Sequence, residues 1–158
     1  MKMPLLISLV VLLGAARLFA AETTPADPVI VQAVLDANAR LTDASNRLDT
    51  EAFFAGIVDS DETRIIQDGR LFKTRAEAKA VVRQGSLGIV QVQRTFDDPR
   101  VTVLGPGAAL LTADGTTRVT LPDGRTIDGR FAVTLVFVLR EGRWLLFHGH
   151  YSIPNPDR

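Results

Sequence analysis

Apolar residues in the first third of the chain recur with the spacing of an amphipathic helix. They lie three or four positions apart, at Ile30, Val34, Ala37, Leu41, Ala44 and Leu48. This spacing places one apolar stripe along a helix. Asp27 is suited to cap its start because its carboxylate can accept a hydrogen bond from a first-turn backbone N–H. Pro28 is suited to the first helical position, where a backbone N–H has no partner inside the helix. A second, short helix is predicted from Asp49 to about Gly56.

The pattern then changes from helical to extended. Segment 63–67 is rich in β-branched residues, and Asp68-Gly69 after it is a hairpin signal. Thr74 and Glu77 have the spacing of a capping box, which predicts a third helix ending near residue 85. Alternating strands and turn residues follow, with predicted strands at 89–97, 100–104, 108–121, 125–140 and 143–152. Helices followed by long antiparallel strands predict an α+β fold with helices on one face of a sheet.

Both histidines of the chain lie in the last predicted strand. Side chains of a regular strand alternate between its two faces. The predicted first face carries Trp144, Leu146, His148, His150 and Ser152, and the second carries Leu145, Phe147 and Tyr151. Two imidazoles and a hydroxyl at the end of an apolar face predict the polar mouth of an apolar cavity.

Residues 1–20 have the features of a signal peptide. Lys2 precedes an apolar run over 5–16, and cleavage is expected near Ala20. The run is shorter than the ~20 residues of a membrane span, although Arg17 keeps an uncleaved N-terminal anchor as an alternative. We therefore expect a periplasmic or secreted protein with no membrane contact after cleavage. A linker over 21–28 would lead into one domain over 29–154.

Charge narrows the choice of partners. Of the 18 basic residues, removal of Lys2 and Arg17 leaves 16 against 18 acidic ones, a net charge of −2. No basic patch suited to phosphate-rich surfaces stands out, which argues against nucleic acid and anionic membranes as partners. The chain has no cysteine, so disulfides and thiol chemistry are excluded.

Two helices, a hairpin, a third helix and a series of long strands resemble the nuclear-transport-factor-2-like superfamily, in particular its SnoaL-like branch. The resemblance covers about residues 29–154. Gly142-Arg143-Trp144 followed by His148, His150 and Ser152 is similar to the last strand of the association domain of calcium/calmodulin-dependent kinase II. The resemblance implies a cone whose curved sheet and helices enclose a pocket. It also implies a homodimer packed through the outer face of the sheet.

These observations predict a small-molecule pocket without a cofactor. The predicted ligand-binding residues are Trp144, His148, His150, Ser152, Arg94, Arg118, Phe54 and Phe96. One hypothesis is a protein that binds a small, largely apolar ligand without chemistry of its own. A second is a cofactor-independent isomerase, cyclase or hydratase, with His150 as general base and His148 orienting the substrate. A third is an oligomeric assembly module.

Other interpretations of the histidine pair stay open or are disfavoured. The imidazoles could belong to a buried structural network. A metal site would need a third ligand such as Asp68 or Asp114, and we predict no metal. A Ser152–His150 hydrolase lacks a nucleophile elbow. Ketosteroid-isomerase chemistry uses a tyrosine in its oxyanion hole, and here the only tyrosine, Tyr151, is predicted to face away from both histidines.

Overall fold

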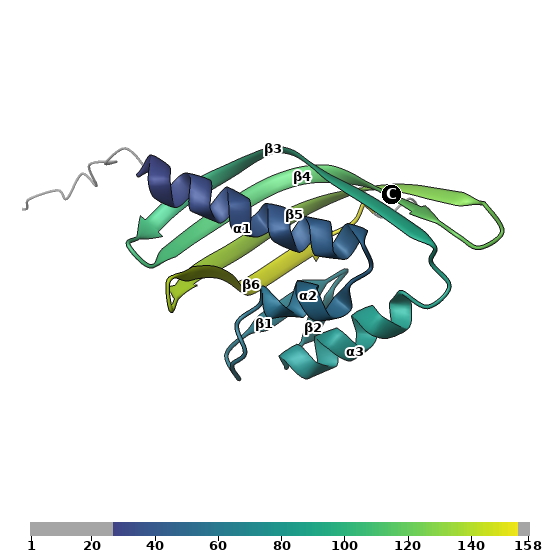
Figure 1. The fold of residues 1–158 in the computed structure, drawn as a ribbon, viewed down its shortest axis with the longest axis horizontal. Helices are drawn as coiled ribbons and strands as arrows, with labels where there is room; N and C mark the ends of the chain where they lie inside the picture. The colour runs from purple at the N-terminus through teal and green to yellow at the C-terminus, as the bar shows by residue number, and fades with distance from the viewer. Residues whose placement is uncertain (1–26, 155–158) are drawn as a thin grey trace, which may run out of the picture.

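The computed structural model describes residues 27–154. The predicted signal peptide over 1–20 and nearly all of the linker over 21–28 lie outside the described residues. Within the described residues, three helices and six strands follow one another (Figure 1). They are α1 (Pro28–Asn46), α2 (Thr50–Ala55), β1 (Arg64–Gln67), β2 (Arg70–Phe72), α3 (Arg75–Gly85), β3 (Gln91–Gly105), β4 (Ala108–Thr120), β5 (Thr126–Arg140) and β6 (Arg143–Ser152).

Side-chain caps start all three helices, as the sequence predicts. The Asp27 carboxylate accepts a hydrogen bond from the backbone N–H two residues on, at 2.9 Å. Asp49 and Thr74 each accept one from the N–H three residues on, at 2.9 and 3.1 Å. Each bond satisfies a first-turn donor that has no partner inside the helix.

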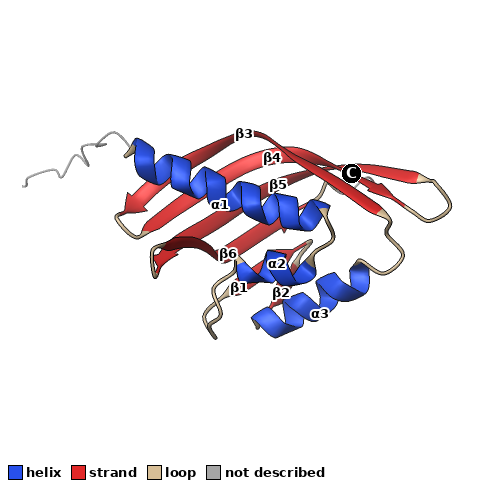
Figure 2. Ribbon diagram, viewed as in Figure 1, coloured by secondary structure: helices blue, strands red, loops and turns tan. Residues whose placement is uncertain are grey.

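The six strands form one sheet in the order β2-β1-β6-β5-β4-β3. Only the β1–β6 pair is parallel, and the other pairs are antiparallel. Helix α1 lies across the long strands, while α2 and α3 lie beside β1 and β2 (Figure 2). The curved, mostly antiparallel sheet with helices packed against it confirms the predicted α+β fold. None of the helices within 27–154 is long and apolar enough to cross a membrane.

The structure corrects the predicted break between strands 89–97 and 100–104. One strand, β3, runs through both, and the register against β4 shifts between Asp97 and Arg100. Asp98 there has a φ of 42°. Asp98-Pro99 therefore forms a bulge rather than a turn. A proline is tolerated at this point because β3 is at the edge of the sheet, where no neighbour needs its N–H.

The two faces of the sheet differ sharply in composition. We call the face that packs against the helices the interior face and the opposite one the outer face. On β5, alternate residues are buried in the core, namely Phe131, Val133, Leu135 and Phe137. The residues between them on the outer face include the exposed Ala132 and Thr134. Directly opposed residues of adjacent strands share a face, so the pairing register carries this assignment across the sheet.

Candidate functional site

A bulge in β6 decides where the histidines lie. Val136 of β5 pairs with His148, but the next residue, Phe137, pairs with Leu146. Phe147 is therefore an extra residue on β6. An inserted residue reverses the alternation of every side chain beyond it. The predicted common face of Trp144, Leu146 and the two histidines is wrong for this reason.

Beyond the bulge, the polar residues of β6 face outward. His148 lies opposite Val136 and is half-buried, whereas His150 lies opposite Thr134 and is exposed. The exposed Ser152 donates a hydrogen bond to the Ala132 carbonyl at 3.4 Å. Tyr151 pairs with the buried Val133 and packs against the core. Tyr151 is therefore on the interior face and, as predicted, faces away from the two histidines.

Arg94 comes from the interior face of β3, at a point where α1 holds the strand edge. The Asn46 side chain accepts from the Arg94 N–H at 2.8 Å and donates to the Arg94 carbonyl at 3.2 Å. This pair of bonds caps two backbone groups that an edge strand leaves unpaired. The guanidinium donates to the Ser45 hydroxyl at 2.8 Å and lies 5.9 Å from the centre of the Phe131 ring. Helix α1 and strand β5 thus fix the position of this cation.

The half-buried Arg94 has no acidic partner among residues 27–154. Two arginines of the outer face, Arg118 and Arg130, behave differently. Arg118 forms two bonds with Asp128, at 2.7 and 3.0 Å, and Arg130 bonds Asp114 at 2.6 Å. A charge withdrawn from water normally requires a partner. Arg94 therefore stands out as an interior cation whose counter-charge this part of the chain does not supply.

Tyr151 is the second polar group of the interior face near this point. Burial raises the pKa of the Tyr151 phenol above its ordinary value of 10.0, and the positive charge of Arg94 acts in the opposite direction. The phenol is therefore neutral at physiological pH and keeps its proton for donation. None of the side-chain hydrogen bonds among the described residues uses its hydroxyl.

Two aromatic rings, those of Phe96 and Phe131, lie on the same part of the interior face as Arg94. Phe96 and Phe131 meet edge to face with ring centres 5.2 Å apart. Phe96 is only half-buried although it faces the helices. We call the four side chains of Arg94, Phe96, Phe131 and Tyr151 the interior cluster. It combines a cation, a neutral hydroxyl and two aromatic rings.

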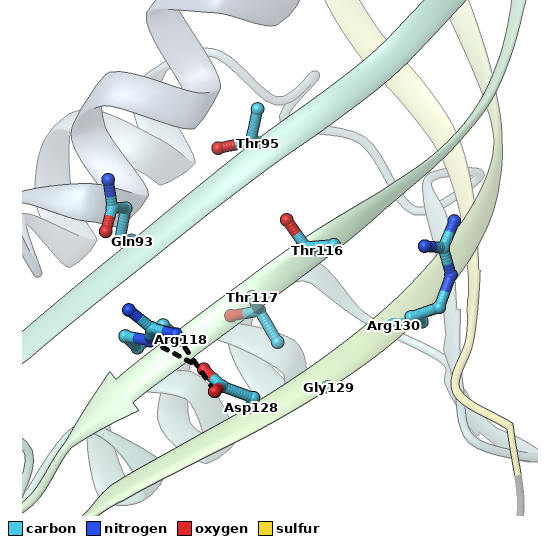
Figure 3. Close-up of a pocket in the computed structure, with 8 residues that line it drawn as sticks. All are labelled: Gln93, Thr95, Thr116, Thr117, Arg118, Asp128, Gly129 and Arg130. Carbon is cyan, nitrogen blue, oxygen red and sulfur yellow. Dashed lines mark hydrogen bonds and ion pairs between the residues drawn. The ribbon is translucent and has the colours of Figure 1, made fainter.

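A separate groove lies on the outer face. Its volume is about 620 Å³. The residues that line it belong to β3, β4 and β5, and Figure 3 shows Arg118 joined to Asp128 within it. They are Gln93, Thr95, Thr116, Thr117, Arg118, Asp128, Gly129 and Arg130. Its charges are already paired, so the groove presents hydroxyl and amide groups rather than a free charge.

The structure thus separates the residues predicted to line one pocket. Arg94 and Phe96 lie together on the interior face. Phe54 and Trp144 are core residues with exposed fractions of 1% and 8%. The remaining four, His148, His150, Ser152 and Arg118, are on the outer face. Neither Asp68 nor Asp114 completes a metal site with the histidines, and residues 27–154 contain no group of three or more metal-binding side chains.

Sequence reasoning missed Tyr151 and Phe131 as site candidates. One signal for Tyr151 was present in the order of apolar residues. Trp144 and Leu146 occupy even positions, whereas the next apolar positions are Phe147 and Tyr151. Such a change of phase indicates a bulge, and a glycine inside a strand is a second sign of one.

Solved structures similar to this chain share its fold. A candidate dehydratase of the nuclear-transport-factor-2-like family from Streptomyces avermitilis is 20% identical, with a TM-score of 0.75, covering 82% of this chain and 99% of its own. A candidate scytalone dehydratase from Novosphingobium aromaticivorans is 11% identical, with a TM-score of 0.70 and coverage of 81% and 86%. The association domain of the C. elegans calcium/calmodulin-dependent kinase II is 18% identical, with a TM-score of 0.66 and coverage of 82% and 99%.

No curated protein matches the chain. The family model of the SnoaL-like domain matches residues 34–156, which is most of the chain. The predicted superfamily and branch are thereby confirmed, and the chain belongs to the SnoaL-like domain family.

Proposed function

We propose that the protein binds a small molecule at the interior cluster, and that this molecule has an apolar body and an anionic or carbonyl oxygen. The observation that carries the proposal is Arg94, a half-buried cation on the interior face without an acidic partner among residues 27–154. A ligand carboxylate or polarised carbonyl would supply the missing partner. Charge-assisted hydrogen bonds of this kind are roughly twice as strong as neutral ones.

The neighbouring groups suit the rest of such a ligand. The half-buried Phe96 and the Phe131 ring offer apolar surface. The neutral Tyr151 hydroxyl offers one donor. Few polar groups placed among apolar and aromatic ones are typical of small-molecule sites. The ligand is thus of the predicted largely apolar kind, with Arg94 and Tyr151 rather than the histidines as its polar contacts.

The test compares two arginines on opposite faces. Arg94→Gln removes the unpaired interior charge, and Arg118→Gln removes a paired charge of similar chemistry from the outer face. Calorimetric titration with benzoate, cinnamate and decanoate, each beside its neutral amide, measures affinity. We expect carboxylates to bind better than amides and Arg94→Gln to weaken carboxylate binding about tenfold, equivalent to one charged hydrogen bond. Equal affinities for acids and amides, or loss in Arg118→Gln alone, would contradict the proposal.

A second candidate function is a cofactor-independent dehydratase or isomerase acting at the same cluster. Two structural neighbours carry the name of candidate dehydratases, and the fold alone does not decide between such activities. Tyr151 would donate its proton, or a hydrogen bond, to an oxygen that becomes negative during the reaction. Tyr151→Phe would then reduce turnover of a bound substrate at least a hundredfold while leaving its affinity within a few-fold. An equal loss of both would indicate that Tyr151 contributes to substrate binding and not to the chemical step.

The roles predicted for His150 as general base and His148 as orienting group remain predictions. They require a substrate on the outer face, because both imidazoles lie there. Histidine-to-alanine variants that retain full turnover would exclude these roles.

We also propose that the protein is exported and that it self-associates. The neighbours include an association domain, which is compatible with a homo-oligomer, and we propose a homodimer. Native mass spectrometry of the protein produced with its own N-terminal segment would measure the subunit number, the mature N-terminus and any retained ligand. A monomer starting at Met1 would contradict both export with cleavage and the dimer.

A further inference from the structure

We propose that His148 and His150 form a chelating pair for a transition-metal ion of the zinc, nickel or copper class on the outer face of β6. Imidazole nitrogens are good ligands for these ions. The two side chains stand on one face, separated by a single residue. The site is independent of the interior cluster, which faces the opposite side of the sheet.

The strand between the two histidines is held firmly. β6 lies between β1 and β5 in the sheet, and the register pairs Gly149 with Ile65 on one side and Leu135 on the other. A Cβ at Gly149 would come within 3.3 Å of the Ile65 Cδ1 and 3.6 Å of the Leu135 Cδ2, so neighbours pack closely on its inner side. Sites on such a fixed strand hold their ligands more accurately than sites on loops.

The spacing of the pair fits one metal ion. Residues two apart in a strand have Cα atoms roughly 6.7 Å apart. Two nitrogens bound at about 2.1 Å to a tetrahedral ion lie about 3.4 Å from each other. Each imidazole therefore needs to lean only about 1.7 Å toward the other. Side-chain torsions of histidine cover this range without moving the backbone.

The surroundings leave the ring nitrogens available. His148 and His150 lie opposite the uncharged Val136 and Thr134 on β5. On β1 they face Arg64 and Ile66. The Arg64 guanidinium donates to the Thr63 carbonyl at 2.9 Å and to the Asp61 carbonyl, which directs it toward the loop before β1. None of the side-chain hydrogen bonds among residues 27–154 involves either imidazole.

The pair supplies two protein ligands. No third histidine, cysteine, aspartate or glutamate joins them within the described part of the chain. The remaining positions on the ion would be filled by water or by an added small ligand. An incomplete protein shell is the arrangement of metal sites that exchange ligands, whereas structural sites are closed.

Zinc alone is the probe for the test, because both histidines of the chain are the pair in question. Calorimetry and proton NMR of the imidazole C–H signals follow a ZnCl₂ titration of the native chain purified without a histidine tag. Single variants His148→Ala and His150→Ala assign the two signals. Ser152→Ala and Thr134→Ala are controls from the same face. We expect one zinc per chain, shifts of both imidazole signals at the same zinc concentration, and affinity at least tenfold weaker in each single histidine variant.

Thermal unfolding of the histidine variants without zinc checks that they are folded. Unshifted imidazole signals, or affinity unchanged in the double variant His148→Ala/His150→Ala, would overturn the proposal without affecting carboxylate binding at Arg94.

Discussion

Arg94 on the interior face differs from Arg118 and Arg130 on the outer face in whether it has an acidic partner. On the outer face Arg118 and Arg130 each have an aspartate on the neighbouring strand. On the interior face Arg94 is fixed by Asn46 and Ser45 but has no acidic partner among the described residues. One correctly placed aspartate is enough to pair with an arginine, and the outer face of this sheet has such aspartates. This contrast between the arginines is the observation that supports the proposed ligand at Arg94.

Deleting Phe147 tests how the bulge assigns the residues of β6 to the two faces. Without this extra residue Leu146 can still pair with Phe137 and His148 with Val136, so both histidines should stay on the outer face and Tyr151 on the interior face. Only the half-buried Phe147 side chain and the bend of the bulge are lost. We expect a loss of about 1–3 kcal/mol in the free energy of unfolding, measured by urea denaturation.

Phe147→Ala is the matched control for the deletion. It removes the same side chain but keeps the residue count and therefore the bulge. Because Phe147 is half-buried, this variant should lose only about 1–2 kcal/mol and remain folded. A deletion variant far less stable than Phe147→Ala would mean that the strand does not re-pair as the observed register predicts when the bulge residue is removed.

The bulge also marks the limit of what the sequence could predict. The helix caps, the hairpin at Asp68-Gly69 and the fold class depend on local spacing and were predictable. The change of phase in the apolar positions of β6 was a sign of a bulge, but its exact position depends on how two strands match over their length. One extra residue in β6 was enough to move His148 and His150 from the predicted pocket to the outer face.

The same limit applies to the interior cluster. Arg94 and Phe96 were predicted because alternation along β3 is regular up to the bulge that begins after Asp97. Phe131 was not among the predicted ligand-binding residues. Its proximity to Arg94 arises from packing across β4 and from the position of α1, neither of which is encoded in the spacing of one strand.

The interior face is tightly packed around Gly115. A Cβ there would lie 2.2 Å from the Thr95 carbonyl oxygen and 2.6 Å from the Phe131 Cζ. Gly115→Ala must displace backbone and the aromatic ring, and we expect it to cost roughly 1–3 kcal/mol. Chemical denaturation measures the loss, and carboxylate affinity should fall as well because Phe131 belongs to the interior cluster.

Gly129→Ala is the control on the same side of the sheet. The nearest atom to a Cβ at Gly129 is the Thr117 Cγ2 at 3.5 Å, an ordinary contact. This variant should keep stability within about 0.5 kcal/mol of the native chain. Equal losses in the two variants would show that glycine's flexibility, and not the space taken by Phe131, determines both positions.

A titration of Tyr151 tests the comparison between the two faces through a smaller expected effect. It is the only tyrosine, so ultraviolet absorbance near 295 nm follows this phenol alone. Burial should place its pKa above 10.0, and Arg94→Gln should raise it further because the arginine's charge lowers it. A raised phenol pKa stabilises the fold below the ordinary value and loses this effect as pH rises through the folded-state value.

The matched titration uses Arg118→Gln, whose charge is on the outer face. It should leave the Tyr151 midpoint unchanged, since the arginine that acts on this phenol is Arg94. A midpoint at or below 10.0 in the native chain would mean that the Tyr151 hydroxyl is fully solvated. If Arg118→Gln shifted the Tyr151 midpoint and Arg94→Gln did not, Arg118 would be the arginine that acts on the phenol. The placement of Arg94 beside Tyr151 on the interior face would then be wrong.

The smallest effect is expected at the Arg118–Asp128 pair itself. The hydrogen bond from Arg118 lowers the pKa of Asp128 below its ordinary 3.8, but both side chains are well exposed, at 58% and 61%. A depressed carboxyl pKa stabilises the fold above its ordinary value, and that effect disappears as pH falls through the folded-state value. Arg118→Gln should therefore change the Tm by about 2 °C or less at pH 7 in low salt. The change should become smaller as the pH is lowered below 3.8, and it should vanish in 1 M NaCl at pH 7, where screening removes surface attraction. A larger or salt-insensitive loss would mean that the outer ion pair contributes as much to stability as the interior packing. The two faces would then differ only in the pairing of their arginines.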